Sequence, residues 1–119
     1  MSTILVVEDE FIISLNASML LEDEGFHVDV AYDGAEALEM VAANPPDLII
    51  ADYMMPVMDG LEMITRLRAQ GWAGPIMLVT SIPEEKLPVS YARGHDAYLS
   101  KPYLAQQFIE AVRRLLGNR

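Results

Sequence analysis

Residues 46–60 read PDLIIADYMMPVMDG, and this stretch decides the fold class. Its apolar run at 48–51 (LIIA) contains no polar residue, so it lacks the alternation of a half-exposed strand. A continuous apolar run of this length is typical of a strand that is buried on both faces, as in the middle of a parallel sheet. Asp52 follows the run directly, which predicts a carboxylate at the carboxyl end of a buried strand.

Four similar runs occur elsewhere in the chain, at Ile4–Val7, Val28–Ala31, Ile76–Val79 and Ala97–Leu99. Stretches in which apolar residues recur at helical spacing lie between the runs, and Asp33 and Asp59 stand where each can cap such a helix. The alternation predicts five βα units, and therefore an α/β fold whose parallel sheet is covered by helices on both faces. The alternating stretch 27–30 (HVDV) suits an edge strand.

Two of the predicted helices bear on function. The first ends before Gly25, and its apolar residues recur at helical spacing: Phe11, Ile12, Leu15, Met19 and Leu20. The face formed by Phe11, Ile12 and Leu15 is either a docking surface for a kinase or part of the core. The last helix runs from about Leu104 to Leu116.

The fourth helix should fall in residues 81–94 (SIPEEKLPVSYARG), which contain two prolines. Pro83 suits a first turn. Pro88 in a helix interior would cost about 3 kcal/mol, because it removes a hydrogen bond and clashes with the preceding turn. We therefore expect a short, kinked or partly unwound element here.

Length and composition indicate one globular domain. We expect residues 1–119 to form it with no output domain, since 52% of residues are hydrophobic and 22% are charged. The chain has no cysteine, which excludes disulfide and thiolate chemistry and favours a reducing, cytoplasmic compartment. We expect no signal peptide and no membrane span, because no apolar run approaches about 20 residues.

The charge distribution is uneven. The net charge of −10 argues against non-specific nucleic-acid binding. Of 18 acidic residues, 14 lie in residues 1–65, whereas all 8 Lys and Arg residues lie after them. The acidic first part favours a divalent cation or a basic partner.

Polar side chains follow the predicted strands at their carboxyl ends: Glu8, Asp9, Asp52, Thr80 and Lys101. In open parallel sheets, ligands bind outside these ends, so the five groups should converge at one edge of the sheet. Carboxylates suit Mg²⁺, and an ammonium and a hydroxyl suit phosphoryl oxygens. A carboxylate nucleophile beside a metal can accept a phosphoryl group as an aspartyl-phosphate.

Four motifs occur in order along the chain: ILVVEDE, IIADYMMPVMDG, IMLVTS and AYLSKPY. Through them the sequence as a whole resembles the receiver domain of bacterial two-component response regulators, of the single-domain, chemotaxis-regulator type. The resemblance implies a flavodoxin-like, doubly wound (βα)₅ fold whose five-stranded parallel sheet has the order 2-1-3-4-5.

The resemblance also implies the roles of site residues. Asp52 would be the phosphorylated residue, and Mg²⁺, with Mn²⁺ as a substitute, would be held by four groups: Glu8, Asp9, Asp52 and the backbone carbonyl of Met54. Glu10 would lie outside the site. The Met54 side chain would overlook the site and hinder attacking water.

The resemblance assigns the remaining groups to switching. Thr80 would hydrogen-bond the phosphoryl group, Lys101 would pair with it, and Tyr98 matches the aromatic residue that swings inward with Thr80. The Lys101–Pro102 peptide is often cis in the family. Tyr103 is open to two interpretations, a partner surface or simple packing.

The implied function is a phosphorylation-activated signalling switch rather than a turnover enzyme. A histidine of a sensor kinase or histidine phosphotransfer protein would donate the phosphoryl group, and the surface of the fourth helix, fifth strand and fifth helix would then change to control a partner. We expect no nucleic-acid or membrane partner, and a monomer or weak phosphorylation-dependent dimer. The alternatives are a degenerate receiver that binds without phosphorylation and a Mg²⁺-dependent phosphohydrolase.

Overall fold

The computed structural model describes residues 2–87 and 94–117. Its five strands form one parallel sheet in the order β2-β1-β3-β4-β5, which confirms the predicted fold class and strand order. The strands are β1 (Thr3–Val7), β2 (His27–Ala31), β3 (Leu48–Asp52), β4 (Ile76–Thr80) and β5 (Ala97–Ser100). The helices are α1 (Phe11–Asp23), α2 (Gly34–Ala43), α3 (Gly60–Ala69) and α4 (Ala105–Leu115), with a 3₁₀ turn, η1 (Glu84–Lys86).

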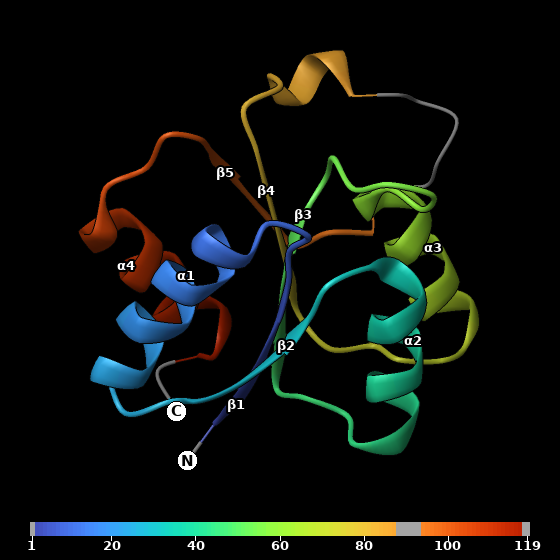
Figure 1. Ribbon diagram of the computed structural model, residues 1–119, viewed down its shortest axis with the longest axis horizontal. Helices are drawn as coiled ribbons and strands as arrows, with labels where there is room; N and C mark the ends of the chain where they lie inside the picture. Colours follow the sequence, from blue (N-terminus) through green and yellow to red (C-terminus); the bar gives the residue numbers. More distant parts are fainter. Residues whose placement is uncertain (1, 88–93, 118–119) are drawn as a thin grey trace.

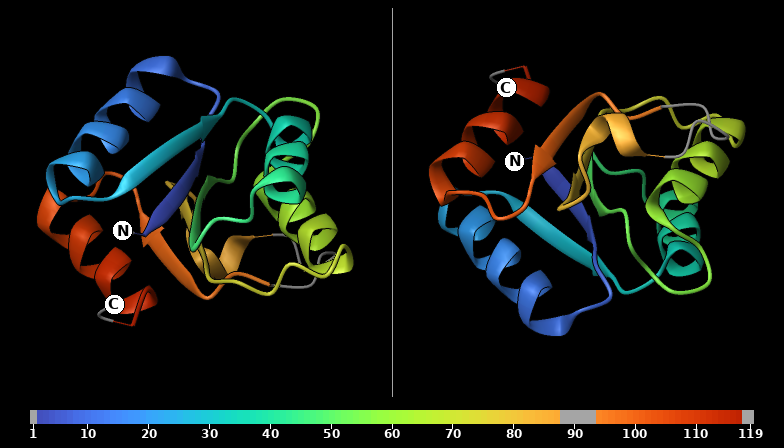
Figure 2. Two further views of the ribbon diagram at one scale, coloured as in Figure 1. Left: turned by 90° about the horizontal axis from the view of Figure 1, so that it is seen from below. Right: turned by 90° about the horizontal axis from the view of Figure 1, so that it is seen from above.

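The helices form a layer on each face of the sheet (Figures 1 and 2). Helices α1 and α4 cover one face, and α2 and α3 cover the other. Strand β3 is buried at all five positions because it lies in the middle of the sheet, whereas β2 is partly exposed at the edge. The continuous apolar run and the alternating run are therefore both explained by position in the sheet.

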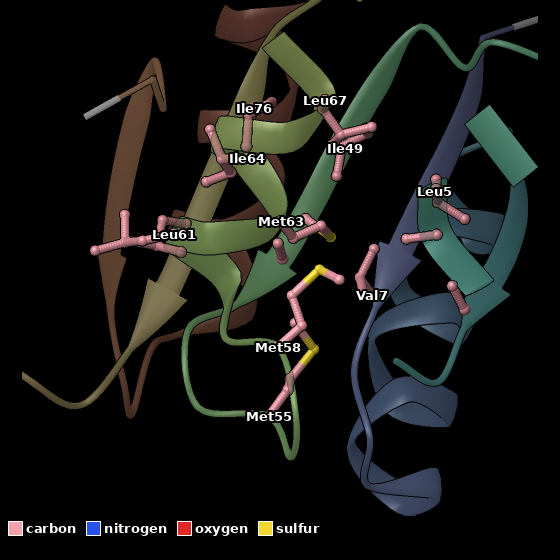
Figure 3. Packing of buried hydrophobic residues seen from close by; sticks show 14 of the residues in the cluster. Leu5, Val7, Ile49, Met55, Met58, Leu61, Met63, Ile64, Leu67 and Ile76 are labelled. Atoms are coloured by element: carbon pink, nitrogen blue, oxygen red, sulfur yellow. The ribbon is translucent and has the colours of Figure 1, made fainter. Parts of the chain in front are cut away.

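Two apolar cores lie between the sheet and its helix layers. Figure 3 shows the α2–α3 side, where Met58 and Met63 pack beside Val7 of β1 and Ile49 of β3. The opposite core, under α1 and α4, contains the fully buried Phe108. These methionines fill irregular space between a strand, a loop and a helix, which suits an unbranched and adaptable side chain.

The predicted helix caps are present. Asp33 accepts a hydrogen bond from the backbone N–H of Glu36, and Asp59 accepts one from Glu62, each at 2.8 Å. Gly25 follows α1 with φ +93°, a left-handed conformation that favours glycine. The start of two helices and the end of a third thus follow from single residues.

Helix α1 exposes large apolar side chains. Its buried residues are Ser14, Ala17, Ser18 and Leu21, while the exposed set is Phe11, Ile12, Leu15 and Met19. Phe11 is 60% exposed and Ile12 is 66% exposed. Of the two interpretations left open by the sequence, core is therefore wrong for this face, and a surface available to a partner remains.

The fourth predicted helix is replaced by a single turn. In the described part of the chain, η1 is the one helical element between β4 and β5, and Pro83 precedes it in an extended conformation. The expectation of a short element after β4 is confirmed, since η1 stands where the fourth helix was predicted. Leu87 after the turn is 2% exposed and joins the core on the α3 side. Pro88 lies outside the described residues.

The chain entering β5 is anchored to α3 by Arg68. Its guanidinium donates to the carbonyls of Gly94 and Gly74 at 2.8 and 2.7 Å and contacts the Asp96 carboxylate at 3.1 Å. A Cβ on Gly94 would lie 2.9 Å from the Ile64 side chain, so the backbone lies directly on α3. One arginine thus holds the entry to β5 against a neighbouring helix.

Val57 is the one non-glycine residue with positive φ in the described chain, at φ 69°. Its side chain is fully exposed, so no packing offsets the cost of placing a β-branched residue in the left-handed region. We expect Val57→Asn to stabilise the protein by about 1 kcal/mol, raising Tm by about 3–5 °C. Thermal unfolding followed by circular dichroism measures this, with Val57→Ile as the matched control that keeps the branched Cβ. An unchanged or lower Tm for Val57→Asn would contradict the strain.

Candidate functional site

The carboxyl ends of the strands bring the predicted polar residues to one rim of the sheet. Glu8 follows β1, Asp52 ends β3 and Thr80 ends β4, and these strands are adjacent and in register. Lys101 follows β5 and donates its backbone N–H to the carbonyl of Thr80 at 2.9 Å. The parallel pairing therefore converts four distant positions in the sequence into neighbours.

Lys101 lies between two carboxylates. Its Nζ is 3.5 Å from Glu8 Oε1 and 3.5 Å from Asp52 Oδ2. Burial alone would lower the pKa of Lys101, but the nearby Asp52 and Glu8 carboxylates outweigh burial and raise it. The ammonium is therefore kept charged at the rim. The Lys101–Pro102 peptide is cis, as the resemblance implied.

Glu8 is the most constrained acid of the site. Glu8 is 4% exposed, and its burial raises its pKa to about 7. The negative charge of Asp52 adds to this rise, whereas the backbone hydrogen bond from Glu10 and the charge of Lys101 oppose it. A carboxylate in this position is destabilised unless positive charge is added. The positive charge of Lys101 therefore does not balance the negative charge of the acids at this site.

The acids fit a hard divalent cation. Carboxylate oxygens of Glu8, Asp9 and Glu10 lie within 4.8 Å of one another, and Asp52 shares Lys101 with Glu8. Such an oxygen-only donor set with excess negative charge suits Mg²⁺. Glu10 was predicted to lie outside the site; its exposed carboxylate lies within 4.8 Å of those of Glu8 and Asp9, and its N–H donates to Glu8 Oε2 at 3.1 Å.

The loop after Asp52 is held by Gly60. The Gly60 N–H donates to the carbonyl of Tyr53 at 2.7 Å, and a Cβ on Gly60 would lie 2.4 Å from the Asp52 carbonyl oxygen. Only glycine permits this approach, which explains the Asp-Gly pair physically. Met54 is exposed and lines, with Asp9, a hollow of about 390 Å³ beside the rim.

Thr80 and Tyr98 are connected through Ile82. The Thr80 hydroxyl oxygen accepts a hydrogen bond from the Ile82 N–H at 3.2 Å, and the Tyr98 hydroxyl donates to the Ile82 carbonyl. Thr80 is buried and Tyr98 is partly buried. The backbone of one residue therefore joins the two predicted switch residues, a connection that the sequence did not reveal because it depends on the loop conformation.

The histidines lie apart from this set. His27 is exposed beside Asp29 on the edge strand, and His95 contacts Glu84 of η1 at 3.0 Å. Tyr103 was left open between surface and packing, and the structure stacks it on Phe108. Sequence patterns could not have settled Tyr103, since its neighbour on α4 is known only from the fold.

Comparison with known proteins gives consistent matches. The model of the response regulator receiver domain matches residues 4–113. Response regulator MprA of Mycobacterium ulcerans is 38% identical over 116 residues, covering 95% of this chain and 49% of the relative. The chain thus spans about half the length of the curated relatives it matches.

Solved structures agree with this match. Chemotaxis protein CheY4 of Vibrio cholerae has a TM-score of 0.89 at 33% identity, covering 97% of this chain and 98% of that one. Response regulator TrrA of Thermotoga maritima, solved in complex with Mg²⁺-BeF, has a TM-score of 0.88 at 32% identity, covering 97% and 99%.

The chain belongs to the response regulator receiver domain family. Receiver domains are the regulatory phosphoacceptor domains of two-component systems and act as phosphorylation switches. Family members bind Mg²⁺ at the phosphorylation site. In the described part of this receiver domain, no helix is long and apolar enough to cross a membrane.

The raised pKa of Glu8 predicts a pH dependence of stability without metal. Because the folded pKa is about 7 and the ordinary value is 4.5, this group stabilises the fold below pH 4.5 and loses that contribution as the pH rises through about 7. We expect Glu8→Gln to raise Tm by about 5 °C at pH 8, and by much less at pH 5. Thermal unfolding in a chelator measures both values, with the exposed Glu39→Gln as control. Equal shifts at the two pH values would contradict it.

Proposed function

We propose that Asp52 accepts a phosphoryl group from a phosphohistidine of a sensor kinase or histidine phosphotransfer protein. The observation that carries the proposal is the position of Lys101, whose ammonium is 3.5 Å from both the Asp52 and the Glu8 carboxylates. A cation held beside a carboxylate at the end of a rigid strand can contact both the nucleophile and a phosphoryl oxygen.

In the transfer, an Asp52 carboxylate oxygen attacks phosphorus while the phosphorus–nitrogen bond of phosphohistidine breaks. The imidazole leaves with the bonding electrons, and an acyl phosphate forms on Asp52. Lys101 meets the charge on the transferred group, and the Thr80 hydroxyl donates a hydrogen bond to it. Because β3 is buried throughout, it holds the Asp52 backbone in a fixed position at the rim.

We propose that Glu8, Asp9, Asp52 and the backbone carbonyl of Met54 hold Mg²⁺. The support is that the Glu8 and Asp9 carboxylates lie close together, that Asp52 shares Lys101 with Glu8, and that the raised pKa of Glu8 indicates excess negative charge. Bound Mg²⁺ supplies positive charge that offsets the negative charge of carboxylates and phosphoryl oxygens. The exposed Met54 side chain limits the approach of water to Asp52 and so prolongs the phosphorylated state.

The switch follows from the hydrogen bonds of Ile82. When Thr80 turns to the phosphoryl group, it gives up the Ile82 N–H, and the loop that also accepts from Tyr98 is released to move. The surface around η1, β5 and α4 then changes and controls a partner protein. This assigns the output to the side of the molecule that has one 3₁₀ turn between β4 and β5.

The phosphodonor docks on α1 in this proposal. Phe11, Ile12, Leu15 and Met19 form an exposed apolar face next to the acidic rim, and Leu104 before α4 is 69% exposed. A partner with an apolar helix face and basic flanks complements that arrangement. A second copy of this chain does not, since acids flank the same face in both copies.

We expect wild-type protein with phosphoramidate and Mg²⁺ to gain one phosphate, seen by intact mass spectrometry. Asp52→Asn and treatment with a chelator should each abolish the adduct, because the first removes the nucleophile and the second the offsetting charge. Asp47→Asn is the matched control, because Asp47 lies at the other end of β3 and accepts the Thr3 N–H. An adduct retained by Asp52→Asn would contradict the assignment.

The same experiment separates the alternatives. A degenerate receiver would give no adduct on wild-type protein, and a phosphohydrolase would turn over unrelated phosphoesters rapidly. The second is disfavoured by Met54, which stands where such enzymes place an acid–base carboxylate.

Docking on α1 predicts a selective loss of transfer. We take a histidine phosphotransfer domain that phosphorylates the wild type. Ile12→Ser and Met19→Ser should each slow phosphotransfer from this domain by about tenfold or more, while the rate of phosphorylation by phosphoramidate is unchanged. Tyr32→Ser, which changes an exposed aromatic residue that follows β2 and is not part of α1, is the control. Equal transfer rates in all variants would show that α1 is not the docking face.

A further inference from the structure

A small cavity lies beneath the rim, with a volume of about 20 Å³. Its polar wall consists of Glu8, Asp52, Lys101 and Tyr103, and apolar side chains including Phe108 form the rest. This volume has room for a single water molecule, which requires two to four polar partners. The four polar residues supply enough partners to hold one.

Tyr103 has a fixed position at this cavity. Its ring stacks on Phe108 with centroids 5.0 Å apart and planes 14° apart, and Phe108 is fully buried. Burial raises the pKa of Tyr103, with Lys101 opposing the rise and Glu8 adding to it, so the hydroxyl is neutral and within electrostatic range of both. A neutral phenol can both donate and accept a hydrogen bond.

The groups that Tyr103 faces are otherwise loosely held. The two 3.5 Å distances from Lys101 Nζ are longer than an ordinary N–H···O hydrogen bond, which measures about 2.7–3.2 Å between the heavy atoms. Glu8 Oε2 accepts from the Glu10 N–H at 3.1 Å, its carboxyl also interacts with the Asp9 side chain, and Oε1 lies 3.5 Å from the Lys101 ammonium. A further polar partner on this side would fix the pair.

We propose that the Tyr103 hydroxyl is a positioning group for Lys101 and Glu8, acting through one water molecule in the cavity. The inference rests on the proposed phosphotransfer to Asp52 and adds a residue to it. Tyr103 holds the ammonium near the Asp52 carboxylate, and so it increases the fraction of molecules in which Lys101 is already placed to contact the phosphoryl group. Phenylalanine would keep the stack and lose the bridge.

The test compares Tyr103→Phe with wild type in phosphorylation by phosphoramidate at saturating Mg²⁺. We expect the maximal rate constant to fall about three- to tenfold, the effect of losing one net hydrogen bond, with half-saturating phosphoramidate and Tm unchanged. Tyr32→Phe, which removes a hydroxyl from an exposed tyrosine, should behave as wild type. A merely structural role would lower Tm without changing the rate constant of the folded protein.

The outcomes are distinct. Wild-type and Tyr103→Phe rates that agree within twofold overturn the positioning role and leave the phosphorylation of Asp52 standing. No adduct on wild type overturns both. If Tyr103→Phe lowers Tm, a high-resolution crystal structure of the wild type decides the question. A water molecule within hydrogen-bond distance, about 3.2 Å, of Tyr103 Oη and of Glu8, Asp52 or Lys101 supports the bridge. The absence of such a water molecule overturns it.

Discussion

The sharing of Lys101 by Glu8 and Asp52 is the constraint on which the rest of the site depends. Two nearly buried carboxylates close together repel each other, and burial raises the pKa of Glu8. Their coexistence requires a cation between them, and the 3.5 Å contacts of Lys101 supply it. Because Lys101 follows β5, it must reach past β4, so the strand order that brings β4 and β5 beside β3 is a condition of the charge balance.

That constraint separates what the sequence could predict from what it could not. Buried parallel strands can be predicted from sequence because both of their faces must be apolar. The apolar run at 48–51 and the position of Asp52 after it therefore predicted the fold class. The helix caps Asp33 and Asp59 were predictable for a different reason: each accepts a hydrogen bond from a backbone N–H only three residues further along the chain. Local and two-sided restrictions are therefore readable in a single sequence.

Helix α1 shows where that reading stops. Its apolar residues identified a helix but not the buried face, because α1 is apolar nearly all round and its close approach to the sheet selects small residues such as Ser14 and Ala17. Hydrophobic size alone favoured the opposite face. Likewise, convergence of the strand-end groups was predictable from topology, whereas Glu10, Ile82 and Tyr103 joined the site through loop conformations and a contact with α4.

The segment between β4 and β5 gives the proposed switch its character. Leu87 is buried in the core at one end, and Arg68 binds Gly94 and Asp96 at the other, so the described flanks are fixed on α3. Between Thr80 and η1, Ile82 packs against the core and makes the two hydrogen bonds that join Thr80 and Tyr98. Moving a whole helix would require repacking of an apolar face, whereas exchanging these bonds requires rotation of a short extended segment. In the proposed switch, the rigid strand end at Asp52 would fix where the phosphoryl group arrives, and the exchange of the Ile82 hydrogen bonds would keep small the free energy needed to respond to it.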